Sequence, residues 1–152
     1  MKLAEALQRR ADINSKISKL RSNMEDSVLV QENEEPDFDI AKLLKEHDEL
    51  IEERTELIDK INEVNNKTVD PETGKTVAQL ISLRDSLKTR MATYQQIVDK
   101  AGQKSWRSSG KEIRTVTTVK VKDIQKKVDE MAKMFRQVDN KIQMLNWATD
   151  IE

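Results

Sequence analysis

The sequence predicts an all-α protein, an antiparallel four-helix bundle or coiled coil with long helices. Apolar and charged residues each make up 36% of the 152 residues, a balance that suits long amphipathic helices. Three glycines, two prolines and 3% aromatic residues leave little turn or core material for a β-sheet. The third observation is a heptad pattern near the C-terminus, where apolar residues alternate steps of three and four: Val121, Ile124, Val128, Met131, Phe135, Val138, Ile142 and Leu145.

Helical spacing recurs in four segments of similar length, which we expect to form one domain over residues 1–152. Asp37 or Asp39 can cap the second helix, because an aspartate side chain accepts hydrogen bonds from the free N–H groups of a first turn. Before the third helix, residues 70–74 (DPETG) are typical of a turn. The expected helices span about 2–26, 40–65, 77–101 and 121–146.

Two short segments interrupt the helical period, and we expect both to be strands. Residues 28–31 are apolar at their start, and residues 113–119 form a β-branched run that disfavours a helix. In an up-down-up-down bundle the first and third connections emerge at the same end. We therefore predict a small two-stranded β-ribbon at one end of the bundle, with the acidic loop 32–39 facing the basic residues of the third connection.

Four polar residues occupy core-type positions of the predicted seams: Arg10, His47, Arg54 and Arg84. An unpaired buried guanidinium is costly, so each arginine should pair with a carboxylate or reach solvent. We interpret these polar layers as fixing helix register or oligomer state; a polar ligand pocket is the alternative. The di-iron pattern of helical bundles needs Glu-x-x-His on two helices, and this chain has one histidine, with Leu44 at the glutamate position. No metal site or cofactor is expected.

The third connection is the candidate interaction region. Its tryptophan stands among four basic residues, and a stacking aromatic among cations suits single-stranded nucleic acid. Pairing of these cations with the acidic loop, within one chain or between subunits, is the simpler interpretation, so nucleic acid is the less favoured partner. The candidate interaction residues are Trp106, Arg107, Lys111, Arg114 and Val116.

Composition also restricts the classes of function. The 27 basic and 28 acidic residues interleave, so no global field steers the protein toward nucleic acid or an anionic membrane. There is no cysteine, and no apolar run is long enough to cross a membrane, which predicts a cytoplasmic protein without an integral membrane segment. The GKT at 74–76 lacks the earlier glycine of a phosphate-binding loop, because Val69 stands there. With no nucleophile–base pair either, we expect a protein that is not an enzyme.

Several stretches resemble the septicolysin-like family of uncharacterised bacterial proteins: MKLAEAL at the start, VQENEEP, INEVNNKT, LRD at 83–85, EIRTVTTVKV and IQMLNW. The family name implies a thiol-activated pore-forming activity, which the cysteine-free sequence does not favour. The leading hypothesis is a helical bundle that acts through self-association, as a homo-oligomer, or through an unidentified protein partner. The alternatives are a nucleic-acid-associated accessory protein using residues 104–114 and, from the family name, a membrane-active protein.

Overall fold

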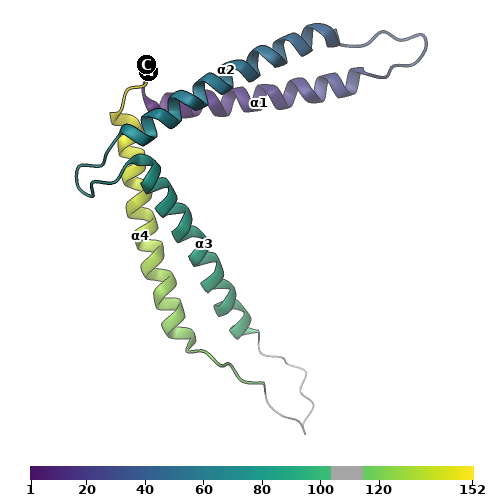
Figure 1. Ribbon diagram of the computed structural model, residues 1–152. Coiled ribbons are helices and arrows are strands. Elements are labelled where there is room, and N and C mark those ends of the chain that lie inside the picture. The colour runs from purple at the N-terminus through teal and green to yellow at the C-terminus, as the bar shows by residue number, and fades with distance from the viewer. Residues whose placement is uncertain (104–114) are drawn as a thin grey trace. The chain divides into compact units, whose positions relative to one another are not determined.

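The structure, a computed structural model, describes residues 1–103 and 115–152, and these residues form four α-helices (Figure 1). Their bounds lie within two residues of the expected ones. The prediction of an all-helical chain is confirmed. The helices are α1, Leu3–Ser27, α2, Ile40–Lys67, α3, Val77–Gly102, and α4, Val121–Ala148.

The chain divides into two compact units. Unit 1 comprises Met1–Val77 and Gln143–Glu152, and unit 2 comprises Ala78–Ile142. In unit 1, α1 and α2 run side by side as an antiparallel hairpin, and in unit 2 α3 and α4 do the same (Figure 1). The closure of all four apolar stripes into one bundle stays a prediction.

The core of unit 1 is completed by the two ends of the chain. The Leu3 N–H donates to the Thr149 carbonyl at 3.0 Å, and the Ile151 N–H donates to the Met1 carbonyl at 2.8 Å. Lys2 adds an ion pair with Asp150 at 3.0 Å. These bonds hold the C-terminal segment against the start of α1, where it helps to cover one cluster of buried side chains: Leu3, Ala6, Ile13, Leu57, Ile61 and Ile151.

Local sequence signals explain where α2 and the following turn begin. The Asp39 carboxylate accepts from the N–H groups of Ala41 at 3.1 Å and Lys42 at 3.3 Å, which is the cap expected from the sequence. In the next connection, the buried carboxylate of Asp70 accepts from the Thr73 hydroxyl at 2.6 Å. Gly74 follows with φ +68°, a conformation that glycine adopts without strain.

The heptad seam of α4 faces the interior of unit 2. Val128, Val138 and Ile142 are buried, and Phe135 is half-buried, whereas the charged residues between them are mostly exposed. On α3, Leu80 and Leu87 are buried in the same way. Two helices thus share one narrow apolar seam, as the alternating three–four spacing predicts.

The predicted β-ribbon is wrong for the residues that the structure describes. Residues 28–31 contain no strand, and Val28 itself has helical angles, φ −67° and ψ −36°. Of the segment 113–119, the described residues 115–119 contain no strand either, and the Thr117 hydroxyl accepts from the Val119 N–H at 3.3 Å. A side-chain oxygen that accepts a hydrogen bond from a backbone N–H competes with the hydrogen bonds between strands. A two-stranded ribbon is also marginally stable in water, so a β-branched composition alone was not enough to form a strand.

Leu57 and Leu44 provide a matched test of where the core of unit 1 lies, because both are leucines of α2. Leu57 is 7% exposed and Leu44 is 48% exposed. We expect Leu57→Ala to lower the free energy of unfolding by about 2–5 kcal/mol and Leu44→Ala to lower it by less than about 1 kcal/mol. Denaturant titration of dilute protein measures both. Equal losses would show that the core extends further along α2 than the structure places it.

Candidate interaction surface

The apolar core of unit 1 covers only part of the α1–α2 hairpin. Leu20 is the last buried apolar residue of α1, and Leu57 is the first of α2. Between them, in the part of the hairpin that includes its loop, no apolar side chain is buried. We call residues 21–56 the acidic arm, for the charge described below.

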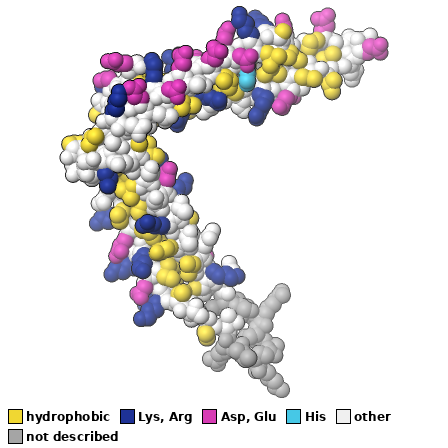
Figure 2. Space-filling view, viewed as in Figure 1, with side chains coloured by type: hydrophobic (Ala, Val, Ile, Leu, Met, Phe, Trp, Pro, Cys, Tyr) yellow, Lys and Arg dark blue, Asp and Glu magenta, His cyan; other side chains and the backbone are white. Residues whose placement is uncertain are grey.

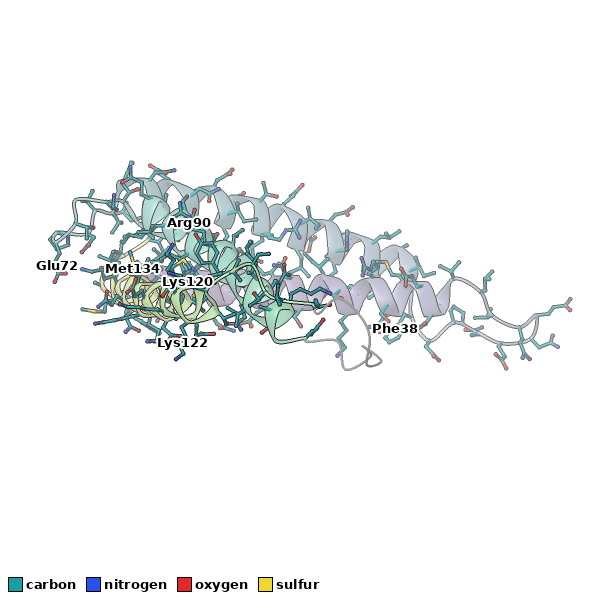
Figure 3. The ribbon with its side chains drawn as sticks, turned by 90° about the horizontal axis from the view of Figure 1, so that it is seen from below. Phe38, Glu72, Arg90, Lys120, Lys122 and Met134 are labelled. Carbon is teal, nitrogen blue, oxygen red and sulfur yellow. The ribbon has the colours of Figure 1, made fainter. Side chains whose placement is uncertain are left out.

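Apolar side chains of the acidic arm are nevertheless numerous. Leu29 is 86% exposed, Val28 61% and Leu44 48%, and Val30 and Phe38 are exposed as well. Phe38 lies on the connection between the two helices (Figure 3), and Leu43 and Leu50 on α2 are half-buried. The helical stripe therefore continues along the arm, where its shielding from water is incomplete.

Acidic residues are concentrated in the same stretch. The arm has 13 Asp and Glu residues against four Lys and Arg residues, a net charge of −9. The whole of unit 1 has 21 acidic and 12 basic residues, so its remainder is neutral. In Figure 2, Asp and Glu side chains crowd the α1–α2 hairpin beside its apolar stripe.

Unit 2 has the opposite charge. Its sequence contains 15 basic and seven acidic residues, a net charge of +8, and the described residues alone carry 11 basic and six acidic residues. Lys120 and Lys122 lie at the start of α4 (Figure 3). The expectation that charges simply interleave was therefore wrong, because the near-zero net charge of the chain is the sum of two opposite surpluses. Counting charge in windows of the sequence would have revealed it.

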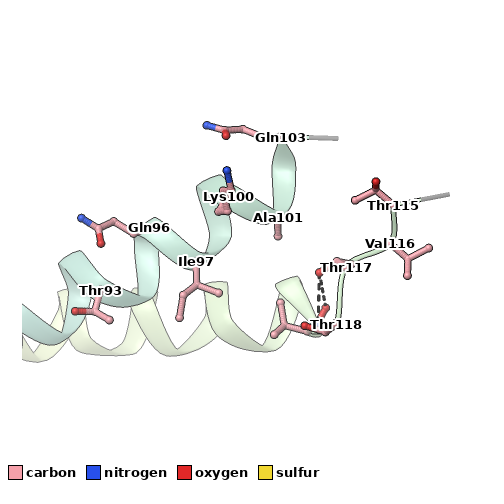
Figure 4. Close-up of a pocket in the computed structure, with 11 residues that line it drawn as sticks. Thr93, Gln96, Ile97, Lys100, Ala101, Gln103, Thr115, Val116, Thr117 and Thr118 are labelled. Carbon is pink, nitrogen blue, oxygen red and sulfur yellow. Dashed lines mark hydrogen bonds between the residues drawn. The ribbon is translucent and has the colours of Figure 1, made fainter. Parts of the chain in front are cut away.

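A groove of about 470 Å³ lies in unit 2 where the described ends of the third connection meet α3. Figure 4 shows Thr93, Ile97 and Lys100 on one side of it and Val116 and Thr117 on the other. Ile97 is 40% exposed and Val116 74% exposed. Its lining, among the residues that the structure describes, includes a cation and no carboxylate, so the groove suits an apolar segment that carries negative charge. It is lined by Thr93, Gln96, Ile97, Lys100, Ala101, Gln103, Thr115, Val116, Thr117, Thr118 and Val119.

The structure places one of the five candidate interaction residues named from the sequence. Val116 lines the groove of unit 2 and is exposed. The other four, Trp106, Arg107, Lys111 and Arg114, lie outside the described residues. The exposed apolar surface of the acidic arm could not be predicted from the sequence, because periodicity places a residue on a helix face without showing whether that face is covered.

Arg84 is the polar seam residue with the clearest partner. Its Nη1 donates to Oδ1 of Asp139 on α4 at 3.0 Å, and its Nε lies 3.6 Å from the Asp85 carboxylate. The Arg84 side chain is 28% exposed and that of Asp139 35% exposed. Arg84 thus meets the expectation of a carboxylate partner and joins the two helices of unit 2 at one register.

The other three polar seam residues lie in unit 1. Arg54 donates to the Asn14 side chain at 3.2 Å, and its Nε is buried without a hydrogen-bond partner. His47 Nδ1 lies 3.1 Å from the carboxylate of the neighbouring Asp48. Arg10 is half-buried. In the contacts that the structure describes within each unit, the four polar seam residues do not meet at a common site. Their role in fixing helix register or oligomer state stays a prediction.

Glutamates of α2 take part in exposed ion pairs. Arg9 on α1 meets Glu53 on α2 with its Nη2 2.5 Å from the carboxylate, which ties the two helices of the hairpin together. Further along, Lys67 hydrogen-bonds Glu63 one turn earlier and thereby lowers the pKa of the Glu63 carboxyl. Both pairs are exposed, and such pairs contribute little to stability.

These features define a class: an all-helical protein of two antiparallel hairpins, one carrying an acidic arm and the other a basic surface. The chain belongs to a family of unknown function, DUF6847, which matches residues 10–151. It is also similar to a functionally unknown conserved protein from Corynebacterium diphtheriae, whose crystal structure is known. The two sequences are 35% identical, and the two structures superpose with a TM-score of 0.92. That similarity covers 100% of this chain and 99% of the other. No curated protein matches the chain.

The resemblance to the septicolysin-like family was wrong. The family shown by residues 10–151 is a different one, and neither it nor the similar crystal structure points to septicolysin. The quoted stretches are short, and short runs of this kind carry too little specific chemistry to separate one helical family from another. Among the described helices, none is long and apolar enough to cross a membrane.

Asp139 and Asp85 give a matched test of the Arg84 ion pair. Asp139→Ala removes the closer, partly buried partner, and we expect the free energy of unfolding to fall by about 1–2 kcal/mol. Asp85→Ala removes a partner whose side chain is 65% exposed, and a change within about 0.5 kcal/mol is expected. The double variant Arg84→Leu with Asp139→Leu should recover most of the loss. Thermal or denaturant unfolding decides; equal effects of the two alanine variants would contradict the assignment.

Proposed function

We propose that this protein acts by binding protein surfaces, its own copies among them, through the α1–α2 hairpin, and that it is not an enzyme. The observation that carries the proposal is the acidic arm, in which no apolar side chain between Leu20 and Leu57 is buried. Exposed apolar residues gathered into one stretch and bordered by charge are typical of interaction sites.

The physical reason is the limited shielding that two helices give each other. An amphipathic helix needs its apolar stripe covered, and burial contributes roughly 25 cal/mol per Å² of apolar surface removed from water. Near the chain ends the stripe is covered with the help of Ile151. Along the acidic arm a partner can supply the same cover, with Leu29 and Leu44 as the most exposed leucines of α1–α2.

Existing contacts of the polar residues support binding rather than catalysis. Arg84 pairs with Asp139 across two helices, and His47 meets Asp48, its neighbour in the chain. The first contact joins two helices and the second links neighbouring residues of one helix. Neither places a nucleophile beside a base. The homo-oligomer and the cytoplasmic location expected from the sequence both stay predictions.

A nucleic-acid-associated role is the second candidate, and the basic surplus of unit 2 is the observation that favours it. Lys and Arg residues that neutralise phosphates make affinity fall steeply with salt concentration. The acidic arm of the same chain would repel a polyanion, which is why this role ranks second. Binding of a labelled single-stranded oligonucleotide at two salt concentrations tests it.

Site-specific photo-crosslinking in the cell that makes this protein tests the proposed function. A photoreactive phenylalanine analogue replaces Leu29, in the acidic arm, or Met144, which is 72% exposed on α4 of unit 1 outside the arm. We expect Leu29 to give covalent protein adducts and the Met144 control to give few, because a partner covers the arm. No adduct at Leu29, or the same adducts at both positions, would contradict the proposal; a nucleic-acid adduct would favour the second candidate.

A further inference from the structure

We infer that the acidic arm of one copy docks on unit 2 of a second copy of this chain. The inference rests on the proposed function and names the partner of the same surface. It follows from two complementary surpluses in one molecule, −9 on the arm and +8 on unit 2. Because each copy has both surfaces, two copies can exchange arms around a two-fold axis and satisfy both signs at once.

The exposed apolar groups of the two surfaces also match. The loop end of the arm presents Val28, Leu29 and Val30, followed directly by the carboxylates of residues 32–39. Unit 2 presents the groove that contains Ile97 and Val116, with Lys100 in its lining. Seating the apolar loop residues in this groove removes apolar surface from water on both copies.

In the proposed complex, exposed lysines of unit 2 lie next to the groove, where they can face the acidic residues of the arm's loop. Lys120 and Lys122 are exposed directly after the groove residue Val119, at the start of α4. Glu34 and Glu35 are exposed in the loop of the arm. Charges of opposite sign placed around an apolar contact raise the association rate and select the partner, and salt weakens them because the Debye length is about 10 Å at 0.1 M.

A near-neutral chain is well suited to such pairing. The formal net charge of −1 leaves no general repulsion between copies, while the separated surpluses orient one copy against another. A basic foreign protein could satisfy the arm alone, but the second copy satisfies the arm and unit 2 together. That is the reason for committing to a second copy as the occupant.

Charge reversal on each surface, followed by mixing, tests the inference with purified full-length protein. Variant A is Glu34→Lys with Glu35→Lys, and variant B is Lys120→Glu with Lys122→Glu. We expect wild type to be larger than a monomer at low salt and to dissociate as salt rises. Each variant alone should associate at least about tenfold more weakly, because like charges then face each other at the proposed contact between residues 34 and 35 of one copy and residues 120 and 122 of the other.

An equimolar mixture of A and B should recover association, because the cations introduced at positions 34 and 35 of A then face the carboxylates introduced at positions 120 and 122 of B, and the reverse pair is unchanged. Sedimentation velocity measures all samples. The control Asp59→Lys with Glu152→Lys changes net charge as A does, outside the arm, and should associate like wild type. Variants that associate like wild type, or a mixture that stays monomeric, would overturn the inference.

The outcome also separates this inference from the proposed function. A wild type that stays monomeric at tens of micromolar in low salt overturns docking on a second copy. If crosslinking from Leu29 still captures a different protein in the cell, the proposed function stands without the inference. If crosslinking captures nothing as well, both are overturned.

Discussion

Two helices packed side by side shield one narrow apolar seam from water, and in unit 1 the fully buried part of that seam ends at Leu20 on α1 and Leu57 on α2, beyond which Leu50 is half-buried. Toward the chain ends, the backbone bonds between Leu3 and Thr149 and between Ile151 and Met1 bring in a third segment that completes the cover. Toward the loop, no described segment of unit 1 plays that part, yet the apolar stripe continues. Unit 1 thus has one end with a buried apolar core and another end whose apolar side chains stay partly or largely exposed.

The distribution of charge follows the same boundary. The part of unit 1 with a complete core is neutral, whereas the arm carries all of the unit's acidic surplus, and unit 2 carries the balancing basic surplus. A surplus of like charge beside partly exposed apolar groups opposes indiscriminate association. Under the proposed function, the same residues favour partner surfaces that are basic and apolar together, which is a simple physical basis for specificity.

Much of this fold could be predicted from the sequence because the relevant signals are local. The three–four spacing of α4 and the Asp39 cap act within a few residues, and both are present in the structure. The β-ribbon failed because a β-branched run such as 115–119 has no strand without a neighbouring strand to pair with. The pairing of Leu3 with Thr149 joins residues far apart in the chain, so no window of sequence could show it. The sequence showed that Arg84 is a polar residue in an apolar seam. It could not show that Asp139 is the carboxylate that pairs with Arg84, because that depends on how α3 and α4 are aligned.

Hydrogen exchange along α2 tests the central claim most directly, since one helix passes from the arm into the core. We predict that in dilute protein the amides of 43–51 exchange much faster than those of 57–65, and that raising the concentration at low salt slows exchange mainly in 43–51. Uniform protection of the whole of α2 at every concentration would show that the arm is already covered within one chain, and would contradict the account.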